Sequence, residues 1–372
     1  EEHRRAAASA EDRHHGRGPR LTPCRPQPFE RRGIEQRLVA GDEDRGLRRR
    51  RQGRQPGGHR AALPRPPAGT LDDLDRHVDA DPALTAPIEA ALTAALDSAY
   101  AEEGDDAAAH LFLQRTLYRI NRLKLFWYDD LARYDNERSN YLRLVRDRIE
   151  DRWQGWEREQ LDAAALERLD VETALRERSR ADVDPPISAN GLYFREAAGE
   201  AGYRKLLEIV SLDGLVEASQ LSRTLGGVSN EIHAMLTRLF LEEYGYGRLE
   251  RKHSSYFATM LTELGMDTTP EAYFDSVPWQ VLAAINHSFL LSERKRYFLR
   301  YVGGLLYTEI SVPAGFSAYR ACAQRLGLSA SAMAYWDLHI KEDERHGRWM
   351  LDDISLPLAR QYPEHAWELV LG

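Results

Sequence analysis

The stretch AMAYWDLHIKEDERHGRWM, residues 332–350, determines how the rest of the chain is interpreted. His339, Asp343 and His346 stand at positions i, i+4 and i+7, which a helix of about 3.6 residues per turn brings onto one stripe. Apolar residues share this stripe and predict that it is buried: Ala332, Tyr335, Trp336 and Met350. Three ligand-type side chains on a buried stripe favour a metal site. The alternative is a solvated face, because the KEDER segment is charged throughout.

A second stretch, YVGGLLYTEISVP at residues 301–313, carries one carboxylate on an apolar helix face. Glu309 follows three apolar residues of that face at helical spacing: Val302, Leu305 and Leu306. No cation lies within a helical turn of Glu309. An unpaired buried carboxylate costs several kcal/mol or takes up a proton. Glu309 therefore needs a partner from another helix, and either a metal ion or a core arginine would serve.

A third stretch, LFLEEYGYGRLERKHSSY at residues 239–256, offers a histidine with several carboxylates before it. Glu250 precedes His253 by three residues, while Glu242 and Glu243 precede it by eleven and ten. The i, i+3 spacing favours Glu250 as the partner of His253. The longer step to Glu243 crosses two glycines, where a bulge or kink would be required. The residues alone leave Glu243 and Glu250 open.

The three stretches together predict a two-metal site. Glu250–His253 and Asp343–His346 share a carboxylate-x-x-His spacing, and Glu309 adds a carboxylate from a further helix. This is the ligand pattern of di-iron carboxylate bundles. Hard carboxylates balance the charge of two Fe(II) ions, and imidazoles complete each coordination sphere. Iron therefore fits best among the divalent metals, with manganese second.

The pattern of the whole chain is helical. Helices are expected near residues 84–99, 106–133, 137–158, 163–180, 201–224, 229–246, 248–264, 271–276, 278–309, 314–326, 329–352 and 354–370. No strand pattern and no phosphate-binding glycine loop occurs. The segment ADVDPPISANG, residues 181–191, is the best internal boundary, because two prolines and a glycine stop a helix. We predict an all-α protein with an N-terminal helical region at 70–185 and a second domain at 186–372.

The first 69 residues have a different composition from the rest of the chain. They hold 17 arginines and 9 acidic residues, so their net charge is 17 − 9 = +8. Because the whole chain carries −8, the remaining residues carry −16. Scattered proline and glycine without a helical period predict a disordered extension over residues 1–69. The acidic remainder argues against nucleic acid as a partner.

Membrane and disulfide chemistry are also disfavoured. No apolar run approaches the roughly 18 to 20 residues that a membrane helix needs, so no membrane partner is expected. The two cysteines, Cys24 and Cys322, form no CxxC motif, which excludes a disulfide scaffold and a thiolate metal site. We expect a cytoplasmic protein.

The order of these motifs resembles the haem-oxygenase-like di-iron oxidases, a family of iron-containing redox enzymes. The resemblance covers about residues 75–372 and is strongest to the N-oxygenase branch, typified by an N-nitrosourea-forming enzyme. In that branch the glutamate lies ten residues before its histidine, which selects Glu243, and an earlier helix adds a carboxylate that corresponds to Glu217. The resemblance thus implies a haem-oxygenase-like bundle with a metal-ligand set of Glu217, Glu243, His253, Glu309, His339, Asp343 and His346. It also implies that the N-terminal helical region serves dimerisation.

The implied activity is O2-activating oxidation at two Fe(II) ions. The expected reaction is N-hydroxylation of an amine or guanidine nitrogen of a small amino-acid-like substrate in natural-product biosynthesis, with an external electron donor as a possible partner and a homodimer as the assembly. The chain departs from the typical relative by stopping at Gly372, where a C-terminal cupin domain would begin. The alternatives are oxidative C–C cleavage of a fatty or amino acid, a ferritin-like storage protein, and a non-catalytic iron-binding helical protein.

Overall fold

Every regular element is a helix in the part of the chain that the structure describes, which confirms the all-α class. The computed structural model describes residues 73–101, 106–126, 131–227 and 230–372, so the predicted disordered extension at 1–69 lies outside the described residues. The α-helices are α2 (Asp73–Ala80), α3 (Ala86–Ala99), α4 (Ala107–Asn121), α5 (Asn140–Glu159), α6 (Ala163–Glu167), α7 (Val171–Val183), α8 (Ala189–Glu196), α9 (Glu200–Gly214), α10 (Glu231–Glu243), α11 (His253–Glu263), α12 (Trp279–Glu293), α13 (Phe298–Arg325), α14 (Ala330–Arg348), α15 (Leu356–Gln361) and α16 (Trp367–Leu371).

Shorter helical segments connect them. The 3₁₀ segments are η1 (Pro82–Thr85), η2 (Arg122–Lys124), η3 (Leu131–Tyr134), η4 (Ser219–Thr224), η5 (Gly245–Gly247), η6 (Leu249–Arg251), η7 (Phe274–Ser276) and η8 (Lys295–Tyr297). A π-helical segment, η9 (Trp349–Ser355), continues directly from α14. π-Helical turns are uncommon and occur often at functional sites. None of the described helices is both long and apolar enough to cross a membrane.

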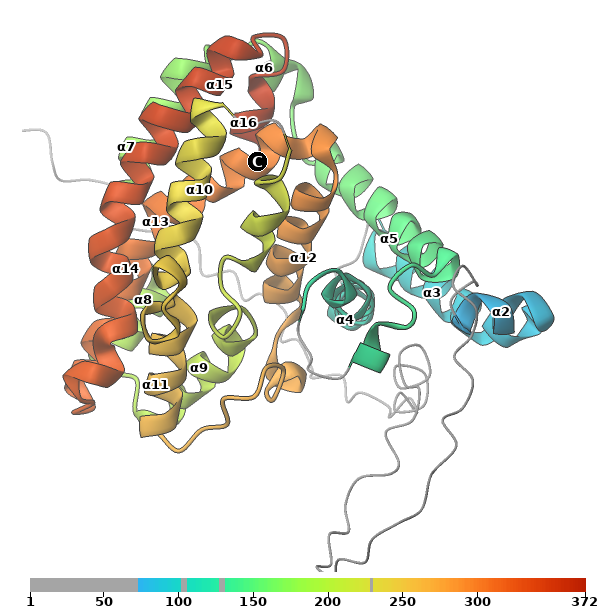
Figure 1. Cartoon of the computed structure of the whole chain (residues 1–372), viewed down its shortest axis with the longest axis horizontal. Coiled ribbons are helices and arrows are strands. Elements are labelled where there is room, and N and C mark those ends of the chain that lie inside the picture. Colours follow the sequence, from blue (N-terminus) through green and yellow to red (C-terminus); the bar gives the residue numbers. More distant parts are fainter. Residues whose placement is uncertain (1–72, 102–105, 127–130, 228–229) are drawn as a thin grey trace, which may run out of the picture. The chain divides into compact units, whose positions relative to one another are not determined.

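Helices α13 and α14 pack against each other, with α14 at the left edge of the view in Figure 1. Helix α11 packs against α14, and α10 packs against the π-helical continuation of α14. Fully buried apolar side chains fill the space between these elements, among them Leu236, Val302, Met350 and Ile354. This burial holds the inward faces of α13 and α14 at fixed positions, which is what a metal site needs.

The N-terminal helices have a core of their own. Helices α3, α4 and α5 enclose Leu113, Leu117 and Ile149, all fully buried. Helix α4 packs on α12, where the side-chain amides of Asn121 and Asn286 form a buried hydrogen bond of 3.1 Å. This bond satisfies polar groups that would be costly to bury alone.

The expected break near residues 181–191 coincides with the end of α7 and the start of α8. Packing does not stop there, however. Leu175 of α7 lies in the same apolar core as Leu306 of α13 and Leu358 of α15. The division of the chain at residue 185 stays a prediction, and α7 packs with the second domain.

Two expected helix boundaries near α13 are wrong. The helix predicted over 278–309 is interrupted by η8, and α13 then continues past residue 309 without the expected gap at residues 310–313. Pro313 lies inside α13 although proline lacks the N–H that a helix interior uses. The bond that Pro313 cannot make is the one that the carbonyl of Glu309 would accept, four residues earlier.

Candidate metal centre

Glu217 lies in a break between α9 and η4, where one continuous helix had been expected. Helix α9 ends at Gly214, where a Cβ atom would lie 3.0 Å from the Phe257 ring of α11. Ala218 then takes a left-handed conformation with φ 59°. The reversal turns the chain away from the α9 axis. Glu217 thereby leaves the surface of a regular helix and reaches the interior.

Glu243 and His253 face each other across the glycine segment that separates α10 from α11. Gly245, Tyr246 and Gly247 all have positive φ values of 59°, 53° and 78°. A Cβ at Gly245 would approach the backbone of Arg251 within 2.5 Å, so only glycine fits there. This is the kink that the ten-residue step required. It places the last residue of α10 beside the first residue of α11.

Helices α13 and α14 supply the remaining four side chains. Glu309 comes from the middle of α13, and His339, Asp343 and His346 come from the predicted stripe of α14. All four are buried. The helices approach closely because Gly347 has no side chain, since a Cβ there would lie 2.9 Å from Cγ1 of Ile310.

All seven predicted ligands meet in two groups that share one residue. The first group contains Glu217, Glu243, His253 and His339, and the second contains Glu243, Glu309, Asp343 and His346. Within each group, one nitrogen or oxygen atom per residue lies within 4.8 Å of the others. Glu243 belongs to both groups, which is the arrangement of a carboxylate that bridges two ions. Glu250, the rival to Glu243, is exposed and belongs to neither.

The first group is compact. Nδ1 of His253 lies 2.8 Å from Oε2 of Glu243 and 3.2 Å from Nε2 of His339. Nε2 of His339 lies 2.9 Å from Oε1 of Glu217. Two imidazole nitrogens and two carboxylates thus converge on one point.

The second group is arranged around Nδ1 of His346. This atom lies 3.2 Å from Oε2 of Glu309, 3.4 Å from Oε1 of Glu243 and 3.8 Å from Oδ1 of Asp343. The two oxygens of Glu243 therefore point to different groups, Oε2 to the first and Oε1 to the second. One carboxylate reaching two sites with separate oxygens fits a bridging ligand.

Outer hydrogen bonds set the orientation of the histidines. Nδ1 of His339 lies 2.8 Å from the backbone carbonyl of Tyr335, which requires a proton on Nδ1 and leaves Nε2 free to face Glu217. Nε2 of His346 lies 3.0 Å from Glu242, which is itself hydrogen-bonded to Arg345 and to Tyr246. Metal-binding histidines in proteins commonly have such a partner on the second nitrogen.

The sequence patterns had not assigned roles to three residues of this region. Glu242 adjoins Glu243, and their pairing at the end of α10 is the signal that was available. The hydroxyl of Tyr335 donates to Oε1 of Glu217 at 2.9 Å, and nothing in the spacing indicates that contact. Burial raises the pKa of Asp213 to about 7, and the negative charge of nearby Glu217 adds to this effect.

Electrostatics at the site are set first by burial and then by crowding of like charges. Burial and the charge of Glu309 raise the pKa of Asp343 to about 9. Burial also raises the pKa of Glu309, although His346 opposes this. Burial disfavours protonation of His339, yet the charges of Glu217 and its neighbours outweigh it and raise its pKa to about 10. The clustered carboxylates are stabilised by nearby positive charge, and in metal-free protein bound protons provide it.

In the described part of the chain, two buried carboxylate oxygens lack hydrogen-bond partners, which favours metal ions over protons as the positive charge at this site. Oε2 of Glu217 and Oδ1 of Asp343 are buried without a hydrogen-bond partner among the described residues. A buried carboxylate oxygen left without a donor carries a full desolvation cost. One such atom lies in each group, and a cation coordinated there would satisfy it. The donor set, with four carboxylates and three imidazoles, fits a pair of Fe(II) ions.

Comparison with known proteins supports iron. Residues 204–372 match the sequence model of a family described as iron-containing redox enzymes. This segment, slightly less than half of the chain, is similar to the haem-oxygenase-like iron-containing redox enzymes. All seven clustered residues lie within it. The chain is also similar to a nitrosourea synthase from Streptomyces achromogenes subsp. streptozoticus, at 28% identity over 150 residues, which is 40% of this chain and 32% of that relative.

Two cavities lined by the described residues reach the acidic cluster. The acidic cavity, of about 540 Å³, is lined by five of the seven clustered residues, namely Glu217, Glu243, Glu309, His339 and Asp343, and by the side chain of Asp213. Its walls are largely apolar and include Val210, Leu221, Ile285, Leu305 and Phe316. A cavity of this size suits a small-molecule substrate.

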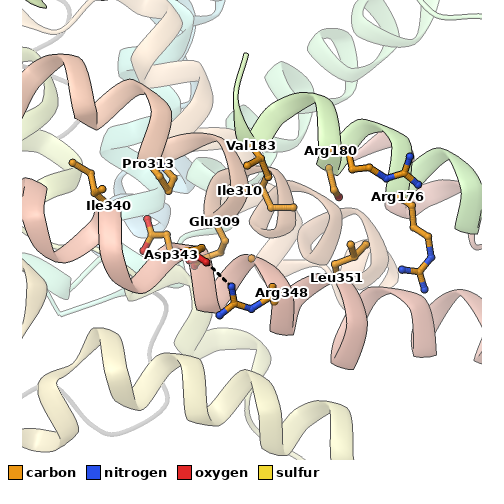
Figure 2. Close-up of a pocket in the computed structure, with 13 residues that line it drawn as sticks. Arg176, Arg180, Val183, Glu309, Ile310, Pro313, Ile340, Asp343, Arg348 and Leu351 are labelled. Atoms are coloured by element: carbon orange, nitrogen blue, oxygen red, sulfur yellow. Dashed lines mark hydrogen bonds and ion pairs between the residues drawn. The ribbon is translucent and has the colours of Figure 1, made fainter. Parts of the chain in front are cut away.

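The second cavity, the arginine-rimmed cavity, has about 550 Å³ and reaches only Glu309 and Asp343 of the cluster (Figure 2). Arg176 and Arg180 of α7 and Arg348 of α14 line its rim. Figure 2 shows Arg348 close to Glu309 and Asp343, with Arg176 and Arg180 farther along the cavity. The acidic cavity reaches both groups, whereas the arginine-rimmed cavity reaches residues of the second group.

Proposed function

We propose that this chain is a non-haem di-iron oxygenase that uses O2 to hydroxylate an amine or guanidine nitrogen of a small amino-acid-like substrate. The observation that carries the proposal is the pair of four-residue groups sharing Glu243, beside a cavity of about 540 Å³. The match to the sequence model of iron-containing redox enzymes supports iron and redox chemistry. The similarity to a protein named for making nitrosoureas supports nitrogen as the atom oxidised.

Each group of side chains would hold one ion. Glu217 and two histidines would bind the first, and Glu309, Asp343 and His346 would bind the second, with Glu243 between them. When bound, the two Fe(II) ions supply two electrons to O2, one oxygen atom goes to the substrate nitrogen, the other leaves as water, and an external electron donor restores the ferrous state. The protein supplies position and shelter for this chemistry.

The chain's own residues perform that positioning. The carbonyl of Tyr335 keeps the proton of His339 on Nδ1, so that Nε2 faces the first site. Glu242 accepts a hydrogen bond from Nε2 of His346, so that Nδ1 of His346 faces the second site. The apolar walls of the acidic cavity keep bulk water away from the oxidant, which limits unproductive reduction of O2.

An anaerobic Fe(II) titration followed by an O2 pulse tests the metal part of the proposal. We expect about two ions per chain and a transient visible absorbance after mixing. Glu250→Gln is the matched control and should also bind about two ions, because Glu250 is exposed and lies outside both groups. Binding of one ion or none to the unsubstituted chain would refute the di-iron assignment.

A product assay tests the nitrogen part. The iron-loaded chain, an electron donor and O2 are incubated with amines and guanidines of amino-acid size, and products are analysed by mass spectrometry. We expect an added oxygen that fragmentation places on nitrogen. Shortened carbon chains instead of oxygenated nitrogen would show C–C cleavage and replace this proposal with that activity.

A further inference from the structure

The acidic cavity contains one acidic side chain that belongs to neither metal group. Asp213, near the end of α9, lines the cavity together with the clustered residues. Asp213 keeps exposed surface where neighbouring residues of α9 are buried, and it lines this cavity. Among the described residues, no hydrogen bond or ion pair is formed by its carboxylate.

Charge balance makes this carboxylate unusual. Four of the clustered residues are carboxylates, and two divalent ions carry as much positive charge as four ionised carboxylates carry negative. The metal centre is therefore neutral when both ions are present. Among the described acidic side chains that line the cavity, Asp213 is then the one whose negative charge is not balanced by a positive charge.

The described residues that line the cavity supply no cation for it. Neither a lysine nor an arginine is among them. His287 also lines the cavity, but burial and the charge of Arg300 lower its pKa, so it is neutral near pH 7. The nearby phenols of Tyr301 and Tyr335 are held in their neutral form, because burial and carboxylates that include Asp213 raise their pKa values.

The two cavities differ in their charged lining. The arginine-rimmed cavity combines Arg176, Arg180 and Arg348 with three carboxylates, and Arg348 is paired with Glu344 at 2.7 Å (Figure 2). The acidic cavity presents Asp213 between apolar walls, where a carboxylate without a counter-ion is costly. A cation that enters the acidic cavity removes this cost and is thereby selected.

We propose that Asp213 is the substrate-binding carboxylate of this enzyme, and that it pairs with an alkylammonium or guanidinium group of the substrate. Its role is positioning, because a charge pair with Asp213 holds the substrate beside Glu217 and the first metal site. The inference rests on the proposed function for the reaction that follows, but the binding itself requires no turnover.

Anaerobic binding to the iron-loaded chain of residues 1–372 tests the inference. Isothermal titration calorimetry compares L-arginine with L-citrulline, which replaces the guanidinium by a neutral group of equal shape, and L-lysine with L-norleucine. We expect at least one cation to bind about tenfold to a hundredfold more tightly than its neutral counterpart, as for a hydrogen-bonded charge in a sheltered site. Asp213→Asn should abolish this preference and leave the neutral compound's affinity within about twofold.

Three further variants or readouts define the result. Glu200→Gln removes an exposed carboxylate of the same helix and should keep the preference. Asp213→Glu should retain part of it, because the charge remains. Iron stoichiometry should stay at two in every variant, and loss of iron from Asp213→Asn would show a structural or metal-holding role and overturn the inference.

Other outcomes also decide the question. If neither cation binds more tightly than its neutral counterpart, or if Asp213→Asn keeps the preference, the inference is wrong. The proposed oxygenase function fails separately, through absent oxygenated product, while binding dependent on Asp213 persists. Each failure can thus be recognised without the other.

Discussion

Replacing Gly347 by alanine should weaken the contact between α13 and α14 beside the metal centre. The new Cβ would lie 2.9 Å from Cγ1 of Ile310 and 3.4 Å from the carbonyl oxygen of Glu309. Cγ1 belongs to a stiff β-branched side chain in a packed core, so it has little room to withdraw. Overpacking of this kind costs about 1–3 kcal/mol.

The helix propensity of alanine opposes this cost. Alanine in a helix interior is favoured over glycine by about 0.5–1 kcal/mol. The expected net effect of Gly347→Ala is a loss of about 1 kcal/mol, taken as the middle of the overpacking range less the propensity gain. Gly315→Ala in α13 is the matched control, because Gly315 is exposed and a Cβ there would meet nothing within 4 Å. That variant should gain about 0.5–1 kcal/mol.

Thermal unfolding of the metal-free protein measures both effects. The two variants should differ by about 2 kcal/mol, or roughly 4–8 °C in Tm, with opposite signs relative to the parent. Gly347→Ala should also bind iron more weakly, because its Cβ displaces the neighbours of Glu309 and His346. If Gly347→Ala is as stable as Gly315→Ala, the close approach of α13 and α14 at this position is refuted.

Three further predictions concern the metal centre. Glu243→Gln should lose both iron ions and Glu217→Gln only one, because Glu243 alone belongs to both groups; equal stoichiometries by elemental analysis would contradict the bridging role. Glu242→Gln should lower iron affinity about 10- to 100-fold, because Glu242 orients His346; an unchanged affinity in a competition titration would remove that role. Metal-free protein should lose stability as pH rises from 7 to 9. The raised pKa values, about 9 for Asp343 and about 10 for His339, mean that the folded state binds more protons than the unfolded state in that range. A Tm that rises over this range would disprove the charge assignment.

Much of the site was predictable because it follows from local geometry. The stripe of His339, Asp343 and His346 depends only on helical spacing, and the apolar residues around it correctly indicated burial. Glu309 was identified in the same way, as a carboxylate on an apolar face. The residues themselves did not decide between Glu243 and Glu250, since helical spacing favours the exposed Glu250. That preference fails because the left-handed segment at residues 245–247 interrupts the helix, which spacing within a single helix does not describe.

The sequence by itself determined the helical class, the inward faces of α13 and α14, and the residue types that suit iron. These features depend on interactions within one helix, which the order of residues specifies directly. Only the tertiary structure decided that Glu243 is shared between two groups, that Glu242 supports His346, and that Asp213 opens into the cavity. Each of these depends on how separate helices approach, and packing and chain reversals such as the one at Ala218 set that approach rather than any spacing along the chain.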